Sequence, residues 1–276
     1  MPQSPTYYDP YLKNNSAAKE RRNTVIEAMV KYGAITEKQA KAAIATPVND
    51  GLQDLTTKAE NADQNRKVVD AYAKSAISEA QKLGYDTSKS GLKIYTSMDS
   101  SLQQSLYDNA NSGSVTFSSA NLQISATMTN PNNGRVVAQI GGRNVTTTFG
   151  LNRATQSSRS SGSSIKPLLD YGPAIEYLNW PTYRTVVDKK YKYVGTDKDV
   201  YDWDKKYMGN ITMRTALTQS RNIPAVRTLE EVGGANAEKF VNGLGITTDG
   251  TPGGSAAIGI PVTSEQEAAA FGAIAN

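Results

Sequence analysis

The chain has 276 residues, 38% of them hydrophobic and 20% charged, and its formal net charge of +4 is too small and too evenly spread to favour a nucleic-acid partner. No apolar run approaches the length of a membrane span, and the polar opening MPQSPTYYDPYLKNN is not a secretory signal. The sequence holds neither cysteine nor histidine, which excludes disulfides, thiol nucleophiles, Ser-His-Asp triads and His-ligated metals, so any acyl-transfer base must be Lys, Asp, Glu or Tyr.

The first third of the chain is predicted to be mainly helical. Apolar spacing over residues 16–46 indicates a helical hairpin, whose second helix is opened by a capping box at Thr36. Residues 47–60 show little periodicity and are predicted to be a connector. Helical spacing then resumes over residues 65–83.

Strand patterns appear next. GLKIYTSMD, residues 91–99, alternates apolar and polar positions and predicts a strand, after which Asp99 caps a short helix. Residues 122–142 predict a β-hairpin, because two alternating runs flank the turn Pro-Asn-Asn-Gly at 131–134. Strands followed by several helices favour an α+β fold, with an antiparallel sheet and a helical cluster.

The serine-rich stretch ATQSSRSSGSS, residues 154–164, taken alone is low-complexity linker, and an apolar helical pattern follows it. A kink or break is expected at Gly172-Pro173. Later helices are predicted at residues 211–219, 224–232, 236–243 and 264–275, the last opened by the box Ser264-Glu265-Gln266-Glu267.

GSSIKP, residues 162–167, contains a Ser-x-x-Lys pair, Ser163 and Lys166. At a helix start, this spacing puts both side chains on one face, one turn apart. A lysine there can take the hydroxyl proton if burial or a nearby cation lowers its pKa, and the free N–H groups of the helix start can stabilise an oxyanion.

The motif alone is weak, because the chain holds three matches and composition would give about two by accident. Ser16–Lys19 belongs to a charged helix, and Ser90–Lys93 falls on the predicted strand, where positions three apart face opposite ways. Only Ser163–Lys166 follows a hairpin and a glycine and leads into an apolar helix.

A second candidate lies at Ser220-Arg221-Asn222, between two predicted helices. One interpretation is that Ser220 and Asn222 are helix caps. The other is that the turn presents both side chains to a cleft, where Ser220 passes a proton to or from Lys166 and the Asn222 amide holds a peptide backbone. The aromatic stretch 182–207 is predicted to be solvated loop and edge strand, with Trp203 as a possible substrate contact.

Several stretches, in order along the chain, resemble the bifunctional class A penicillin-binding proteins. They include FGLNRATQSSRSSGSSIKPLLDYGPAIEY and YDWDKKYMGNITMRTALTQSRNIPAVRTLEEVG, which are similar to the transpeptidase region, and GLKIYTSMDSSLQQ and NPNNGRVVAQIGGRN ahead of it. The opening MPQSPTYYDPYLKNN and the helices after it resemble the end of the family's glycosyltransferase domain.

The resemblance implies a penicillin-binding/β-lactamase-like transpeptidase fold and three regions. These are residues 1–48 as the helical tail of a glycosyltransferase domain, 49–110 as a linker region, and 111–276 as the N-terminal part of a transpeptidase domain. No Lys-Thr-Gly triplet follows the Ser-x-Asn motif, so we expect a fragment of a longer protein, incomplete at its C-terminus and inactive alone. Ser161 stands at a usual proline position, which is expected to loosen the approach to Ser163.

The implied activity is that of a peptidoglycan D,D-transpeptidase. Ser163 would attack the penultimate D-Ala carbonyl of a stem peptide with Lys166 as base, Ser220 would relay the proton and Asn222 would hold the substrate. The implied partners are stem peptides, glycan strands, β-lactams and other proteins of cell-wall synthesis, at the extracytoplasmic face of a bacterial membrane that anchors the parent protein. No cofactor and no metal site is implied. A D,D-carboxypeptidase or β-lactamase-like hydrolase and a non-catalytic wall-binding module are the alternatives.

Overall fold

The computed structural model describes residues 7–10, 16–52, 56–89 and 91–276, with side chains left undescribed over 56–63. The chain divides into two compact units, Met1–Asp63 and Gln64–Asn276. In the first unit, α1 (Ser16–Lys31) contacts α2 (Glu37–Ala45). The predicted helical hairpin and the capping box at Thr36 are both confirmed, since Gln39 N–H donates to the Thr36 hydroxyl and the Gln39 side chain accepts from the Thr36 N–H.

Helix α3 (Thr56–Lys82) is longer than the sequence indicated. It begins inside the stretch that we predicted to be a connector to residue 60, nine residues before the expected helical start at 65. The difference arises because the sequence from Thr56 to Gln64 has few apolar residues but no helix breaker, so that helical propensity continues the helix without an amphipathic pattern.

The predicted strand over residues 91–99 is wrong. The segment runs beside β2 (Val136–Ile140), but its bonds to that strand come from the Ser97 hydroxyl and from Asp99 N–H rather than from a ladder. Leu92 and Ile94 remain 42% and 41% exposed, so the alternating pattern has no buried face to occupy. Asp99 caps α4 (Ser100–Asn111), as predicted.

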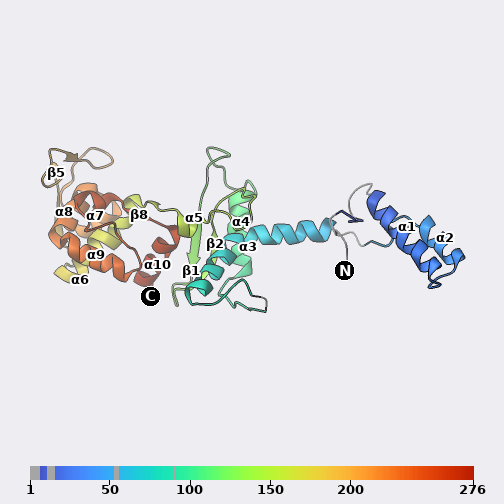
Figure 1. Cartoon of the computed structure of the whole chain (residues 1–276). Helices are drawn as coiled ribbons and strands as arrows, with labels where there is room; N and C mark the ends of the chain where they lie inside the picture. The colour runs from blue at the N-terminus through green and yellow to red at the C-terminus, as the bar shows by residue number, and fades with distance from the viewer. Residues whose placement is uncertain (1–6, 11–15, 53–55, 90) are drawn as a thin grey trace. The chain divides into compact units, whose positions relative to one another are not determined.

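The predicted hairpin is confirmed: β1 (Ala126–Thr129) pairs antiparallel with β2, and the 131–134 turn joins them. Helices α4 and α10 (Ser264–Ala275) both contact this hairpin, as Figure 1 also shows. The cap of α10 lies one residue earlier than predicted, at Thr263, which forms a capping box with Gln266.

The fold is α+β, as predicted, but its described strands form two-stranded antiparallel pairs rather than one larger sheet. Besides β1–β2, these pairs are β3 (Arg159–Ser160) with β8 (Pro261–Val262), β4 (Thr185–Asp188) with β7 (Gly209–Thr212), and β5 (Tyr191–Lys192) with β6 (Asp199–Val200). Short ladders of two to five residues cannot bury much area, so helices supply most of the core.

The main hydrophobic core is built around α8 (Asn222–Val232), which appears within the orange helical cluster of Figure 1. Its contacts include η2 (Pro167–Tyr171), α6 (Gly172–Leu178), α7 (Met213–Thr218), α9 (Gly234–Gly243) and η3 (Gly254–Ile258). α8 buries Ile223, Val226 and Leu229 at helical spacing. The later predicted helices are therefore present, with boundaries shifted by up to two residues.

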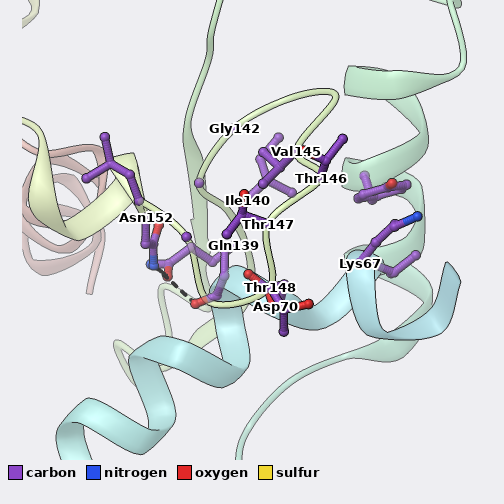
Figure 2. Close-up of a pocket in the computed structure, with 16 residues that line it drawn as sticks. Lys67, Asp70, Gln139, Ile140, Gly142, Val145, Thr146, Thr147, Thr148 and Asn152 are labelled. Atoms are coloured by element: carbon purple, nitrogen blue, oxygen red, sulfur yellow. Dashed lines mark hydrogen bonds between the residues drawn. The ribbon is translucent and has the colours of Figure 1, made fainter. Parts of the chain in front are cut away.

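A buried polar network ties the β1–β2 hairpin to its surroundings. The Gln139 side chain, fully buried, accepts bonds from Ser75 Oγ (2.6 Å) and Asn152 Nδ2 (3.0 Å) and donates to Glu265 Oε2 (2.7 Å). Figure 2 shows the Asn152–Gln139 bond at one wall of a pocket lined by α3, the end of β2 and the loop through Gly142. Because these polar groups already bond to each other, we interpret the network as a structural one that holds the hairpin against its neighbours.

Candidate active site

Ser163 lies just after the β3–β8 ladder. Ser161 continues the ladder: its N–H donates to Ile260 O (2.9 Å), its hydroxyl donates to the same carbonyl (3.1 Å), and Ile260 N–H donates to that hydroxyl (3.2 Å). A proline at position 161 would have neither donor. The expected loosening at Ser161 is therefore wrong: serine fastens the approach to Ser163.

Ser163 and Lys166 are placed by a 3₁₀ turn rather than by an α-helix. η1 spans Gly162–Ile165, and Lys166 N–H donates to the Ser163 carbonyl. With three residues per turn, side chains at i and i+3 eclipse, so Ser163 and Lys166 project from the same face. Ser163 is exposed, as is Ser164, whose hydroxyl donates to Ser161 O (2.6 Å).

The chain then passes into a π-helical turn, η2, in which Gly172 N–H bonds to Pro167 O. A Cβ on Gly172 would lie 2.7 Å from that carbonyl oxygen, so only glycine fits this close approach. The break expected at Gly172-Pro173 is the point at which this turn gives way to α6.

The Lys166 side chain is fully buried and points to the 220–222 turn. Its Nζ donates to Ser220 O (2.7 Å), Ser220 Oγ (3.2 Å) and Asn222 Oδ1 (2.7 Å). An ammonium has three donors, and all three are used. Among the described residues, no hydrogen bond joins Ser163 Oγ to Lys166 or to Ser220.

Burial lowers the pKa of Lys166 from its usual value near 10.5 to about 8. Asp170 and Asp202 act in the opposite direction, and the cationic Arg221 lowers the pKa further. An amine with a pKa of about 8 is partly neutral at physiological pH, as a general base must be.

The structure does not support the interpretation of Ser220 and Asn222 as helix caps. The N-cap of α8 is Arg221, without a side-chain cap bond, and Asn222 is the first helical residue. Asn222 Nδ2 instead donates to Tyr201 O (2.9 Å), which directs the other amide atom, Oδ1, to Lys166. Ser220 has φ +50°, a left-handed conformation that is uncommon for serine.

Trp203 stands beside this turn, but its ring faces solvent. The side chain is 71% exposed, and its Nε1–H donates to the carbonyl of Gln219 (3.2 Å). A substrate contact at Trp203 stays a prediction.

Sequence reasoning missed a group of buried charges next to the motif residues. Arg221 is 1% exposed and is surrounded by the carboxylates of Asp188, Asp202 and Asp204. Asp170 is fully buried, and neither of its carboxyl oxygens has a hydrogen-bond partner among the described residues. The only sequence signal was their spacing from the motifs, four residues after Lys166 for Asp170 and the middle of Ser-x-Asn for Arg221.

Two features are absent from the described part of the chain. No group of three or more Asp and Glu side chains there could hold a metal ion. Likewise, none of the described helices combines the length and apolarity that a membrane span requires.

Comparisons with known proteins place the chain. The profile of the penicillin-binding protein transpeptidase domain matches residues 124–276. Penicillin-binding protein 1A of Streptococcus oralis is 43% identical over 251 residues, which cover 89% of this chain and 39% of that protein. Penicillin-binding protein 1A/1B of Bacillus subtilis is 41% identical over 247 residues, covering 89% of this chain and 26% of that protein.

Solved structures share the fold. The crystal structure of penicillin-binding protein 1A from Haemophilus influenzae has a TM-score of 0.61 at 19% identity and covers 98% of this chain and 53% of its own. The penicillin-binding protein PonA1 from Mycobacterium tuberculosis gives 0.62 at 18% identity, over 73% of this chain and 55% of its own. The chain spans about two fifths or less of the length of the curated relatives named above.

Proposed function

This chain belongs to the family of penicillin-binding protein transpeptidase domains, and from that premise we propose that it is the serine-bearing part of a peptidoglycan D,D-transpeptidase. The observation that carries the proposal is the buried Lys166 amine, bonded to both Ser220 and Asn222 and carried on the same 3₁₀ face as Ser163. Without histidine in the sequence, this amine is the best-placed base.

In the proposed first step, neutral Lys166 accepts the proton of Ser163 as Oγ attacks the carbonyl carbon of the penultimate D-Ala. The peptide C–N bond then breaks, and the departing amine of the terminal D-Ala takes a proton from Lys166 through the Ser220 hydroxyl. This leaves an ester between Ser163 and the donor stem. A hydroxyl suits the relay because it can donate and accept at once.

In the second step, the amine of a neighbouring stem attacks the ester. Its proton passes back by way of Ser220 and Lys166 to Ser163, and a peptide cross-link forms. Asn222 would hold the substrate by its amide, in competition with its present bonds to Lys166 and Tyr201. β-Lactams would acylate the same hydroxyl, because their strained amide presents an equivalent carbonyl.

The whole protein's setting is part of the proposal. Its partners would be stem peptides, glycan strands and β-lactams, and it would work on the extracytoplasmic side of a bacterial membrane, anchored there and bifunctional with a glycosyltransferase domain. The similarity to penicillin-binding proteins named 1A supports this, over the share of their length that the chain covers.

A fluorescent penicillin tests the nucleophile in the full-length gene product that carries this sequence. We expect covalent labelling that is lost in Ser163→Ala and kept in Ser164→Ala, since Ser164 is the exposed neighbour with its own bond to Ser161. Persistent labelling of Ser163→Ala refutes the assignment. Adding an acceptor amine distinguishes cross-linking from release of the stem to water.

A further inference from the structure

We infer that Arg221, the middle residue of the Ser-x-Asn turn, is a positioning residue: its buried guanidinium holds Ser220 and Asn222 in place against Lys166 through a set of aspartates. The inference rests on the proposed function for its kinetic consequences. Its structural part, the fixing of the turn, stands on contacts alone and can be measured without activity.

Each of the three guanidinium nitrogens has a partner. With 1% of its side chain exposed, Arg221 places Nε 2.8 Å from Asp188 Oδ2, Nη1 2.9 Å from Asp204 Oδ1 and Nη2 3.2 Å from Asp202 Oδ2. Nη2 also donates to the carbonyl of Lys206. The planar fork of arginine can serve several acceptors in fixed directions, which a single ammonium cannot.

Asp202 connects Arg221 to Asn222. Its second carboxyl oxygen accepts from the backbone N–H groups of Asn222 (2.5 Å) and Ile223 (3.3 Å), so it caps α8 from a distant loop. The adjacent Tyr201 carbonyl accepts from Asn222 Nδ2. Backbone and side chain of Asn222 are thus both fixed by residues 201–202, and Asn222 Oδ1 is left aimed at Lys166.

The same anchor bears on Ser220. A left-handed serine costs free energy and persists only where its surroundings over-determine it. Ser220 N–H bonds to Leu217 O, and Arg221 N–H to Ala216 O, on one side of the turn, while the Arg221 side chain fixes the other side. Both oxygens of Ser220 that reach Lys166 therefore depend on where Arg221 is held.

Charge supports the same role. A buried ion cluster adds little to stability compared with apolar residues of equal size, so its position between two motif residues needs another explanation. The charged or titratable groups that act on Lys166 are Asp170 of η2, Asp202 of the loop and Arg221 of the turn. Of these three, only Arg221 favours the neutral amine.

The test compares Arg221→Met, Arg221→Lys and a matched control, Arg214→Met, in the full-length gene product. Arg214 is an exposed arginine of α7 that donates to Thr182. The measurements are the second-order rate of penicillin acylation from pH 6 to 10, and amide hydrogen exchange at Asn222 and Ile223.

For Arg221→Met we expect at least a tenfold slower plateau rate, a midpoint moved to higher pH, and at least tenfold faster exchange at both amides. Arg221→Lys keeps the charge but not the fork, so it should retain the wild-type midpoint while the plateau falls. Arg214→Met should match wild type throughout. A shifted midpoint is a change that a merely structural residue would not produce.

Wild-type exchange at both amides in Arg221→Met would overturn the inference, as would an unchanged plateau and midpoint in both variants. If Arg221→Met does not fold, the same measurements on Arg221→Lys and Asp204→Asn decide the question. Asp204→Asn removes the charge of one of the ion-pair partners of Arg221, the partly exposed Asp204. If the wild-type protein is not acylated at all, the proposed function fails, and the exchange data alone then test the positioning role.

Discussion

Lys166 Nζ lies 2.7 Å from Asn222 Oδ1, so the neutral amide of Asn222 is in direct contact with the proposed base. Burial holds the pKa of Lys166 near 8, and the protonated amine cannot accept a proton from Ser163. We therefore expect the rate of penicillin acylation to rise tenfold per pH unit below about pH 8 and to level off above it. Stopped-flow acylation across pH 6 to 10 measures this profile. A rate that is flat across this range would contradict the role of Lys166.

Asn222→Asp adds a charge to the same contact. A carboxylate 2.7 Å from the amine favours its protonated form and raises the pKa of Lys166, so the midpoint should move up by at least one pH unit, with at least a tenfold lower rate at pH 7. Asn236→Asp is the matched control. Asn236 lies at the start of α9, away from Lys166, and its side-chain amide donates to the Val232 carbonyl. The control should keep the wild-type midpoint.

Ser220 separates stability from activity. At φ +50° a side chain with a Cβ is strained, whereas glycine is not, so Ser220→Gly should be about 0.5 to 1 kcal/mol more stable than Ser220→Ala. Both variants lack the hydroxyl proposed to relay the proton, so both should be acylated by penicillin more slowly than wild type. Chemical denaturation measures the stability difference. The opposite order is expected at Thr218, an exposed residue of α7, where alanine is the better helix former.

Gly259 packs against the chain that leads into Ser163. Its φ is +147°, and a Cβ there would meet the Ser160 side chain and lie 2.9 Å from Gly162 N. Gly259→Ala must push the 160–162 segment away, so we expect about 1 to 3 kcal/mol of lost stability and at least tenfold slower acylation. Gly253→Ala, with nothing within 4 Å and an extended φ of −95°, should leave both quantities unchanged.

Asp170 gives a stability prediction with a defined sign. Burial raises the pKa of its carboxyl well above the ordinary value of 3.8, so the folded chain keeps a proton that the unfolded chain releases as pH rises. Stability then falls with rising pH across that interval. Asp170→Asn removes this pH dependence of stability. The melting temperature of the variant, measured relative to that of wild type, should therefore rise from pH 4 to 8. Asp197→Asn, at a fully exposed position, should retain the wild-type trend.

The features that the sequence predicted well are local ones. The 131–134 turn, the Thr36 box and the Asp99 cap depend on side chains within a few residues, so the pattern was sufficient. The strand at 91–99 failed because alternation indicates a strand only if a partner covers one face. The start of α3 was missed because its first turns lack an apolar stripe.

The candidate site follows the same division. The Ser163–Lys166 spacing, read with its sequence context, predicted this pair as candidate residues, and their roles stay a prediction. It did not predict the 3₁₀ turn that carries them, which directly follows the tertiary hydrogen bonds between Ser161 and Ile260. The surroundings of Arg221 were beyond reach of a sequence pattern, because its partners Asp188 and Asp204 lie 33 and 17 residues earlier in the chain.

That separation has a consequence for how the protein folds. Arg221 binds oxygens of residues 188–206, a segment built of short two-stranded pairs and turns. Bringing this segment to the 220–222 turn closes a long loop, which costs chain entropy. Order at the 220–222 turn is therefore coupled to the folding of residues 188–206. Proteolytic cleavage in the exposed loop at 194–197 would leave the hydrophobic core intact while freeing the 220–222 turn from its contacts with residues 188–206.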